Sequence, residues 1–148
     1  MNILLISPKY DSYIVAPHLG LGYLLSYLKK SGHNVKLLDG LREEILYDPK
    51  DWDLVGVSAM STYFPECCIE VARAKAFGLK TIIGGPHIIC DPEQSLIDSQ
   101  ADYAAIGEGE RTIAQLASGI ESNLVEGLIY WEDGKPVVPC SALEITED

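Results

Sequence analysis

Four stretches of the sequence combine glycine, proline and small hydroxyl residues where apolar runs end. They are the long segment 7–22, SAMST (58–62), GGPH (84–87) and GEGE (107–110). Glycine leaves the backbone bare, and serine and threonine offer small hydroxyl groups that donate or accept hydrogen bonds. Any one such loop could be a tight turn. Their recurrence after four predicted strands indicates a binding site for a large ligand.

Several common binding and catalytic motifs are excluded, because the residues that they need are absent or stand at the wrong place in the sequence. Gly20-Leu21-Gly22, with Asp39 further on, superficially matches a dinucleotide-binding fingerprint. The glycines come too late after the first apolar run, and Leu25 occupies the place of the third glycine. We interpret Gly20 and Gly22 as close-packing positions at a helix start. The sequence also lacks a Walker loop, a Gly-x-Ser-x-Gly elbow, a His-Glu-x-x-His pair, and the site residues of receiver domains and flavodoxins.

Strand-like and helix-like segments alternate along the chain and must position these loops. Strands are predicted at 2–7, 34–39, 53–58, 80–85 and 103–108, and helices from about 21 to 31 and at 65–77, 92–99 and 109–119. The strands are apolar in their middle, as in parallel sheets covered on both faces. We predict an α/β, doubly wound, five-stranded parallel sheet of flavodoxin-like or Rossmann-like type, with order 2-1-3-4-5. Ligands bind over the carboxyl ends of such strands.

The C-terminal segment has a different pattern. Two short β runs flank Asp133-Gly134, which predicts a hairpin. The last eight residues are typical of a frayed or truncated end. We predict an α/β domain over residues 1–122, and a hairpin and tail over 123–148 that lead toward a downstream domain.

Composition narrows the class of protein. The 148 residues carry 11 Lys and Arg against 22 Asp and Glu, a net charge of −11, which disfavours nucleic acid and anionic membranes. Apolar runs are too short to span a bilayer, so a cytoplasmic location is expected. The cysteines, which we predict to be buried or unreactive thiols, lack the spacing of zinc ligands and are Cys67, Cys68, Cys90 and Cys140.

The order of these motifs resembles that of a known family. From about residue 2 to 139 the chain is similar to the N-terminal cobalamin (vitamin B12)-binding domain of radical SAM enzymes. The similarity is carried by APHLGLGYLLSYLKKSGHNVKLLD, DLVGVSAMST, TIIGGPHIICDPEQSL, DYAAIGEGERTIAQL and VEGLIYWEDGKPV. GGPH and GEGE at this separation are the specific part of the pattern, because either motif alone is common.

The resemblance implies a corrinoid over the strand ends, with its nucleotide tail between the sheet and the neighbouring helices. It implies that hydroxyl groups of SAMST hydrogen-bond the tail or the corrin amides, that GGPH lines the tail channel and that GEGE borders the corrin. The cofactor-binding residues implied are Tyr10, Tyr13, Ser58, Ser61, Thr62, Gly84, Gly85, Pro86, His87, Gly107, Glu108, Gly109 and Glu110. His87 is expected to orient its loop by hydrogen bonding, and no catalytic residue is implied.

The cobalt is expected to have no protein ligand. Cobalamin domains of the methionine synthase and mutase type carry Asp-x-His-x-x-Gly after the first strand, but here Asp11 is followed by Tyr13 at the histidine position. His18 lies in the same loop, in a Pro-His-Leu-Gly context typical of a helix start. The resemblance implies a lower cobalt face that is open or close to a non-ligating side chain such as Tyr10, Tyr13 or Val15. His33 is expected at the surface.

The chain cannot cleave SAM by itself. Radical SAM chemistry uses a Cys-x-x-x-Cys-x-x-Cys site for a [4Fe-4S] cluster, and the sequence has none. SAM and the cluster would belong to a catalytic domain, downstream in the same polypeptide or in a separate one. The chain is then a non-catalytic cobalamin carrier for methyl transfer or radical chemistry. The alternative is a cofactor-free interaction or small-molecule-binding module of the same fold, and Gly85→Leu is expected to distinguish the two.

Overall fold

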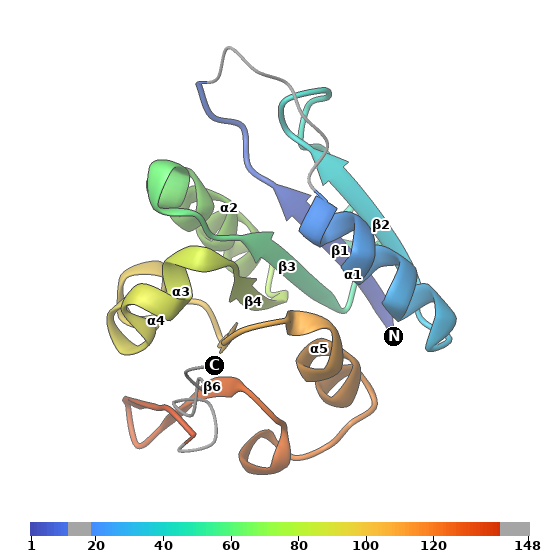
Figure 1. Cartoon of the computed structure of the whole chain (residues 1–148). Coiled ribbons are helices and arrows are strands. Elements are labelled where there is room, and N and C mark those ends of the chain that lie inside the picture. The colour runs from blue at the N-terminus through green and yellow to red at the C-terminus, as the bar shows by residue number, and fades with distance from the viewer. Residues whose placement is uncertain (12–18, 140–148) are drawn as a thin grey trace.

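The predicted parallel strands form one side of a larger mixed sheet, which two antiparallel strands extend. The computed structural model describes residues 1–11 and 19–139, and within them seven strands lie in the order β2-β1-β3-β4-β5-β6-β7 (Figure 1). The strands are β1 (Asn2–Ser7), β2 (Asn34–Asp39), β3 (Leu54–Ser58), β4 (Lys80–Gly84), β5 (Tyr103–Ala105), β6 (Leu128–Glu132) and β7 (Lys135–Val137). β1 to β5 are parallel, which confirms the predicted order 2-1-3-4-5.

The predicted hairpin is present and extends the sheet. Asp133 and Gly134 have φ angles of 50° and 75°, and positive φ at both positions is typical of the type I′ turn between antiparallel strands. β6 pairs antiparallel with β5 as well as with β7. Trp131 Nε1 also donates a hydrogen bond to the Ala101 carbonyl at 2.8 Å. The hairpin is therefore tied to the parallel part of the sheet by backbone and side-chain contacts.

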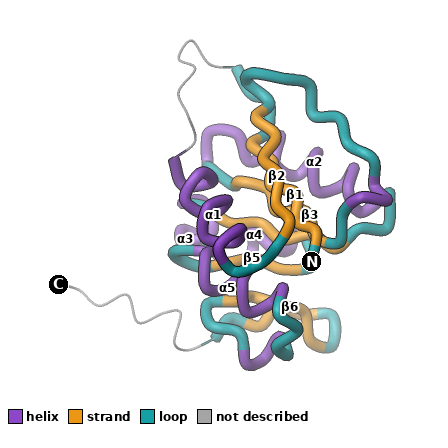
Figure 2. The backbone as a smooth tube through the Cα atoms, turned by 90° about the vertical axis from the view of Figure 1, so that its right-hand side faces the viewer, coloured by secondary structure: helices purple, strands orange, loops and turns teal. Residues whose placement is uncertain are grey.

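Helices cover both faces of the sheet. They are α1 (Leu19–Lys30), α2 (Phe64–Ala76), α3 (Pro86–Cys90), α4 (Pro92–Ser99) and α5 (Gly109–Ala117), with short 3-10 turns at Pro49–Asp51, Ser61–Tyr63 and Ser122–Leu124. Figure 2 shows α1 and α2 on opposite sides of the sheet. Buried side chains of α1 and α5 form one core cluster, and those of α2, α3 and α4 form the other. No helix in the described part of the chain is both long and apolar enough to cross a membrane.

Two strands end earlier than the sequence predicted, and one helix was missed. β5 stops at Ala105 because Gly107, at φ 80°, cannot continue an extended strand. β4 stops at Gly84 because Gly85 turns the chain with φ 135°. The chain then enters α3 (Pro86–Cys90) directly, so Pro86 and His87 form a helical turn where a loop was expected. The predicted fraying of the last eight residues lies outside the described residues.

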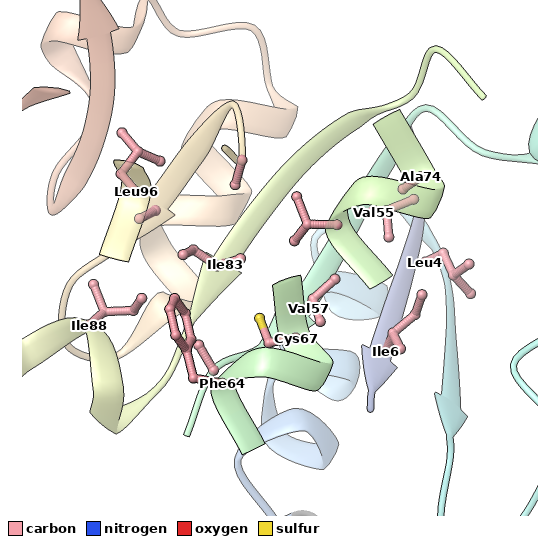
Figure 3. Packing of buried hydrophobic residues seen from close by; sticks show 14 of the residues in the cluster. Leu4, Ile6, Val55, Val57, Phe64, Cys67, Ala74, Ile83, Ile88 and Leu96 are labelled. Carbon is pink, nitrogen blue, oxygen red and sulfur yellow. The ribbon is translucent and has the colours of Figure 1, made fainter. Parts of the chain in front are cut away.

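The face toward α2, α3 and α4 is filled with side chains. Figure 3 shows this packing, in which Val55 and Val57 of β3 and Phe64 and Cys67 of α2 take part. Val55 and Cys67 are fully buried. Burial also raises the pKa of the Cys67 thiol, so this cysteine is the inert core residue that the sequence suggested.

Candidate functional site

A cavity lies on the opposite face, at the carboxyl half of the parallel strands. Its volume is about 420 Å³, within the range of about 300–1,000 Å³ that is usual for ligand sites. The sheet forms its floor, and α1 and α5 form its walls. It is lined by Leu5, Gly20, Leu21, Tyr23, Leu24, Gly56, Val57, Ser58, Met60, Ile82, Ile83, Gly84, Gly85, Pro86, Ala105, Gly107, Glu108, Gly109, Glu110 and Ile113.

Glycines form part of the cavity floor. Gly56 lies in the middle of β3, beside Leu5 of β1 and Ile82 of β4. A Cβ at residue 56 would lie 3.0 Å from Leu5 Cδ2 and 3.6 Å from Ile82 Cγ2. Gly56 was not among the predicted site residues. Its signal was a glycine inside a buried apolar strand, which often marks the close approach of a ligand.

Gly84 and Gly85 have different roles. A Cβ at Gly84 would meet only the Ala105 Cβ, at 3.8 Å, so the space above Gly84 belongs to the cavity. A Cβ at Gly85 would lie 2.5 Å from the Ala59 carbonyl oxygen. The bare backbone at Gly85 is therefore required by the protein's own main chain. Gly85→Leu would disturb the fold at this turn, and the expectation that it distinguishes cofactor binding from partner binding is wrong.

A hydrogen-bonded and stacked group lies beside the cavity. Ser58 lines the cavity, and its hydroxyl forms a 3.0 Å hydrogen bond with the hydroxyl of Tyr63. Tyr63 is buried, and burial raises the pKa of its phenol. The ring of Tyr10 stacks on that of Tyr63, with centroids 4.4 Å apart. Tyr10, which follows β1, is thus linked through Tyr63 to the end of β3.

The turns after β3 and β4 are also joined to each other. Ser61 Oγ and His87 Nδ1 form a hydrogen bond of 3.0 Å, and the His87 ring stacks on Phe64 at 3.9 Å. The backbone N–H of His87 donates to the Ala59 carbonyl, and that of Ala59 donates to Gly84. These bonds agree with the expectation that His87 orients this turn. The His87 ring itself interacts with Ser61 and Phe64 of the protein.

GEGE forms the start of α5 and the adjoining edge of the cavity. Gly107 has a φ of 80° and turns the chain from β5 toward the helix. A Cβ at Gly109 would come within 3.8 Å of both Ala105 and Ile113. Glu108 is exposed and Glu110 is half-buried. The four residues together supply bare backbone and two carboxylates at one rim.

Eight of the residues implied by the resemblance line the cavity: Ser58, Gly84, Gly85, Pro86, Gly107, Glu108, Gly109 and Glu110. Tyr10, Ser61, Thr62 and His87 are outside its lining, although Ser61 and Tyr10 contact the residues described above. Tyr13, Val15 and His18 lie outside the described residues. Gly22 has open space around its Cβ position, so its interpretation as a close-packing glycine is wrong, whereas Gly20 lines the cavity.

The apolar walls were another feature that the sequence analysis missed. Leu21 and Leu24 of α1 and Ile113 of α5 line the cavity and are buried. Helical periodicity marked Leu21 and Leu24 as inward-facing, but core and cavity walls have the same pattern. Among the described residues, no group of three or more His, Cys, Asp or Glu side chains could hold a metal ion. His33 is half-buried beside the N-terminal amine, at the amino end of the sheet.

The sequence family agrees with this geometry. The family model described as the B12 binding domain matches residues 10–117. The chain belongs to the B12-binding domain family. The matched region contains β3, β4, β5 and the helices that surround the cavity. The recognition made from GGPH and GEGE is therefore confirmed, and cobalamin is the cofactor of this domain. No protein among the curated sequences matches the chain.

Solved structures share the fold of this B12-binding domain. The radical S-adenosylmethionine methyltransferase TsrM from Kitasatospora setae, with cobalamin and a [4Fe-4S] cluster bound, aligns with a TM-score of 0.79 and 20% identity over 93% of this chain and 28% of that chain. The cobalamin-dependent radical enzyme OxsB, with aqua-cobalamin bound, aligns with a TM-score of 0.71 and 19% identity over 93% and 22%. A cobalamin-binding protein from Desulfitobacterium hafniense aligns with a TM-score of 0.59 and 18% identity over 81% and 58%. The chain thus spans less than a third of each of the two enzymes.

The residues of the cavity fit part of a cobalamin. Leu24, Ile82 and Ile113 would give apolar contact to a flat ring, and Gly84 leaves room for it. The mouth has hydroxyl, carboxylate and backbone groups that can pair with amides and a sugar phosphate. The chemistry of the lining therefore suits the nucleotide tail.

Proposed function

We propose that this B12-binding domain holds the corrin ring over the carboxyl ends of β1, β3 and β4 and the nucleotide tail in the cavity. The observation that carries the proposal is the cavity of about 420 Å³, whose floor includes Gly56 and Gly84, the second of which borders open space. Both glycines face α1 and α5, where family membership predicts the cofactor. When bound, the cobalamin supplies a cobalt centre that can accept and donate a methyl group.

The residues of this chain would bind and orient the cofactor. Ser58, held by Tyr63, would offer its oxygen to the tail near the cavity mouth. Main-chain groups of Gly84, Gly85 and Pro86 would line the tail channel. Glu108 and Glu110 would accept hydrogen bonds from the amide groups of the corrin rim. Ser61 and His87 would act indirectly, by fixing the two turns relative to each other.

We expect no protein ligand at the lower face of the cobalt. The sequence has Tyr13 where related domains have histidine. Tyr10 is held beside the carboxyl end of β3 by its stack on Tyr63. The Tyr10 side chain would then border the lower face of the corrin without coordinating the metal.

We infer that the chemistry is completed by a radical SAM catalytic domain, in the same polypeptide or in a second one. That domain would supply SAM and the [4Fe-4S] cluster, and residues 123–148 would lead from the sheet edge toward it. The support is the similarity of fold to the TsrM and OxsB structures, of which this chain spans 28% and 22%. We also infer a cytoplasmic location, and the charge of −11 supports the absence of a nucleic-acid partner.

The test is corrinoid uptake by the purified chain. Titration with hydroxocobalamin and methylcobalamin, followed by absorbance and calorimetry, is expected to show binding in the micromolar range or tighter. Gly84→Leu would place a side chain in the cavity, and we expect at least a hundredfold loss of affinity, about 2.7 kcal/mol. Gly22→Leu is the matched control, because residue 22 has open space outside the cavity lining.

Two results would contradict the proposal. If the folded wild-type chain takes up no corrinoid, the cofactor-free module is the better description. If Gly84→Leu and Gly22→Leu bind equally well, the cofactor does not occupy the cavity. Circular dichroism and urea unfolding of both variants exclude loss of the fold as the cause of a change.

A further inference from the structure

The GEGE rim of the cavity, residues 107–110, has few restraints of its own. Two of its four residues are glycines, which lose more backbone freedom on ordering than any other residue. The strand pairing of β5 ends at Ala105, before the rim begins. Glu108 occupies the N-cap position of α5, and its side chain makes no capping hydrogen bond within the described part of the chain. Another element must therefore hold the rim in place.

The stretch Glu126-Gly127, directly before β6, contacts the chain on both sides of the rim. The N–H of Ile106, one residue before the rim, donates to the Gly127 carbonyl at 2.9 Å. The hydroxyl of Thr112, two residues after the rim, donates to the Glu126 carbonyl at 2.6 Å. Thr112 is buried. The rim is thus a loop whose two ends are fixed to a pair of adjacent residues.

The main chain of Glu126 makes the contact with α5. Gln115 Oε1 accepts the Glu126 N–H at 2.9 Å, and the Thr112 hydroxyl donates to the Glu126 carbonyl. Thr112 and Gln115 are three residues apart and therefore lie on the same face of α5. The Glu126 side chain adds little, because its carboxylate forms only an exposed ion pair with Arg111, at 3.5 Å.

Gly127 is the residue type that this contact requires. Its φ angle is 69°, a conformation that favours glycine. A Cβ at this position would lie 3.0 Å from the Ile106 carbonyl oxygen and 3.2 Å from Thr112 Oγ1. The flanking residues Val125 and Leu128 are buried in the core cluster of α1 and α5. The stretch is therefore fixed to the core while it touches both ends of the rim.

We propose that Thr112 and Gly127 are positioning residues, which act on the cofactor by holding the GEGE rim and do not touch the cofactor themselves. Neither residue is among those that line the cavity. This inference rests on the proposed function, in which Glu108 and Glu110 meet the corrin amides. Because Gly127 directly precedes β6, the rim is attached to the same hairpin that would lead toward the catalytic domain.

The first experiment compares three glycines in the purified chain without cofactor. Gly127→Ala places a methyl group against both ends of the rim. Gly119→Ala and Gly134→Ala are matched controls, because these glycines have φ angles of 86° and 75° but open space at the Cβ position. By NMR, we expect Gly127→Ala to shift the amide signals of residues 107–110 and to speed hydrogen exchange of the Ile106 amide about tenfold. Both controls should leave these amides as in wild type.

The second experiment measures the affinity for hydroxocobalamin by absorbance and calorimetry. Thr112→Val keeps the shape of the side chain but removes the hydroxyl that donates to Glu126, whereas Thr112→Ser keeps the hydroxyl. We expect Thr112→Val and Gly127→Ala to bind about tenfold more weakly than wild type, which is about 1.4 kcal/mol. Thr112→Ser, Glu126→Gln and the two glycine controls should bind as wild type does. Urea unfolding verifies that every variant is folded.

The outcomes separate this inference from the proposed function. If the wild-type chain binds no hydroxocobalamin, the proposed function fails and this inference fails with it. If the wild type binds, and folded Gly127→Ala has wild-type rim signals or binds as well as its controls, only this inference is overturned. An equal loss of affinity in Thr112→Ser and Thr112→Val would also overturn it, because packing and not the hydrogen bond would then matter.

Discussion

The two faces of the sheet differ most clearly within β3. Val55 and Val57 point toward α2 and belong to the filled cluster of Figure 3. Gly56 and Ser58, between and after them, face α1 and α5 and line the cavity. Successive strand residues point to opposite faces, so a single strand serves a solid core and a binding site at once.

On the face covered by α1 and α5, the packing is open only near the carboxyl ends of the strands. Near the amino ends of the strands, Ile3, Leu28 and Val35 are buried and pack together. The cavity begins at the row of Leu5, Gly56 and Ile82. A binding site can therefore form beside small residues at the carboxyl ends of the strands, while the rest of the core on the same face stabilises the fold. The two faces should therefore respond differently to substitution.

The largest expected effect compares adjacent leucines of β1. Leu4 is fully buried in the filled cluster, so Leu4→Ala is expected to lower the free energy of unfolding by about 2–5 kcal/mol. Leu5 is also buried but lines the cavity, where part of its surface borders space instead of packed atoms, so Leu5→Ala should cost less stability. Urea unfolding of both variants measures the difference. A larger loss for Leu5→Ala would show that the cavity collapses around Leu5 in solution.

The next effect separates the two glycines at the end of β4. Gly85→Ala forces a side chain onto a backbone with φ 135° and against the Ala59 carbonyl. We expect a loss of about 1–3 kcal/mol in the free energy of unfolding, the usual cost of a strained backbone position. Gly84→Ala is the matched control and should leave stability nearly unchanged, because its Cβ has room. Equal stability of the two variants would mean that the turn relaxes away from Ala59.

A smaller effect tests the link between Ser58 and Tyr63. Ser58→Ala removes a hydrogen-bond partner of the buried Tyr63 hydroxyl. The expected loss is about 1 kcal/mol, at the low end for a buried polar group, because Ser58 borders a cavity that water can enter. Adding Tyr63→Phe should restore part of the stability. If the double variant is less stable than Ser58→Ala by the full cost of Tyr63→Phe alone, the two hydroxyls do not interact.

The smallest effect concerns a carboxylate on the α2 side. Burial raises the pKa of Glu70 in the folded protein, and the charge and hydrogen bonds of Arg73 offset part of the rise. The folded state then binds this proton more tightly than the unfolded chain. Its contribution to stability is full below the ordinary pKa of 4.5 and is lost as the pH rises through the folded pKa.

Glu70→Gln should remove this pH dependence. The stability of the variant relative to wild type is expected to increase from acidic to neutral pH, because only the wild type has to ionise a buried carboxyl whose pairing with Arg73 offsets part of the cost. Urea unfolding at a pH below 4.5 and at neutral pH measures the change. A difference that stays the same at both pH values would show that Glu70 has the same pKa in both states.

Local sequence patterns were sufficient for most of the fold. Apolar runs, the alternation of strands and helices and the Asp133-Gly134 turn predicted the strand order and the hairpin. The ends of β4 and β5 were misplaced because apolar character continues past the point where a glycine turns the backbone. The short helix at Pro86–Cys90 was missed because a single turn has too few residues for a periodic pattern.

The sequence by itself determined the class of fold, the family and the rim of the site, because GGPH and GEGE are local motifs with a fixed order along the chain. Only the tertiary structure decided which glycine borders the cavity and which one makes room for other protein atoms. Gly85 accommodates the Ala59 carbonyl, Gly84 borders open space, and Gly56 accommodates the side chains of Leu5 and Ile82. The physical reason is that a cavity is bounded by residues from several separate elements, and no local pattern records which atoms face one another across it.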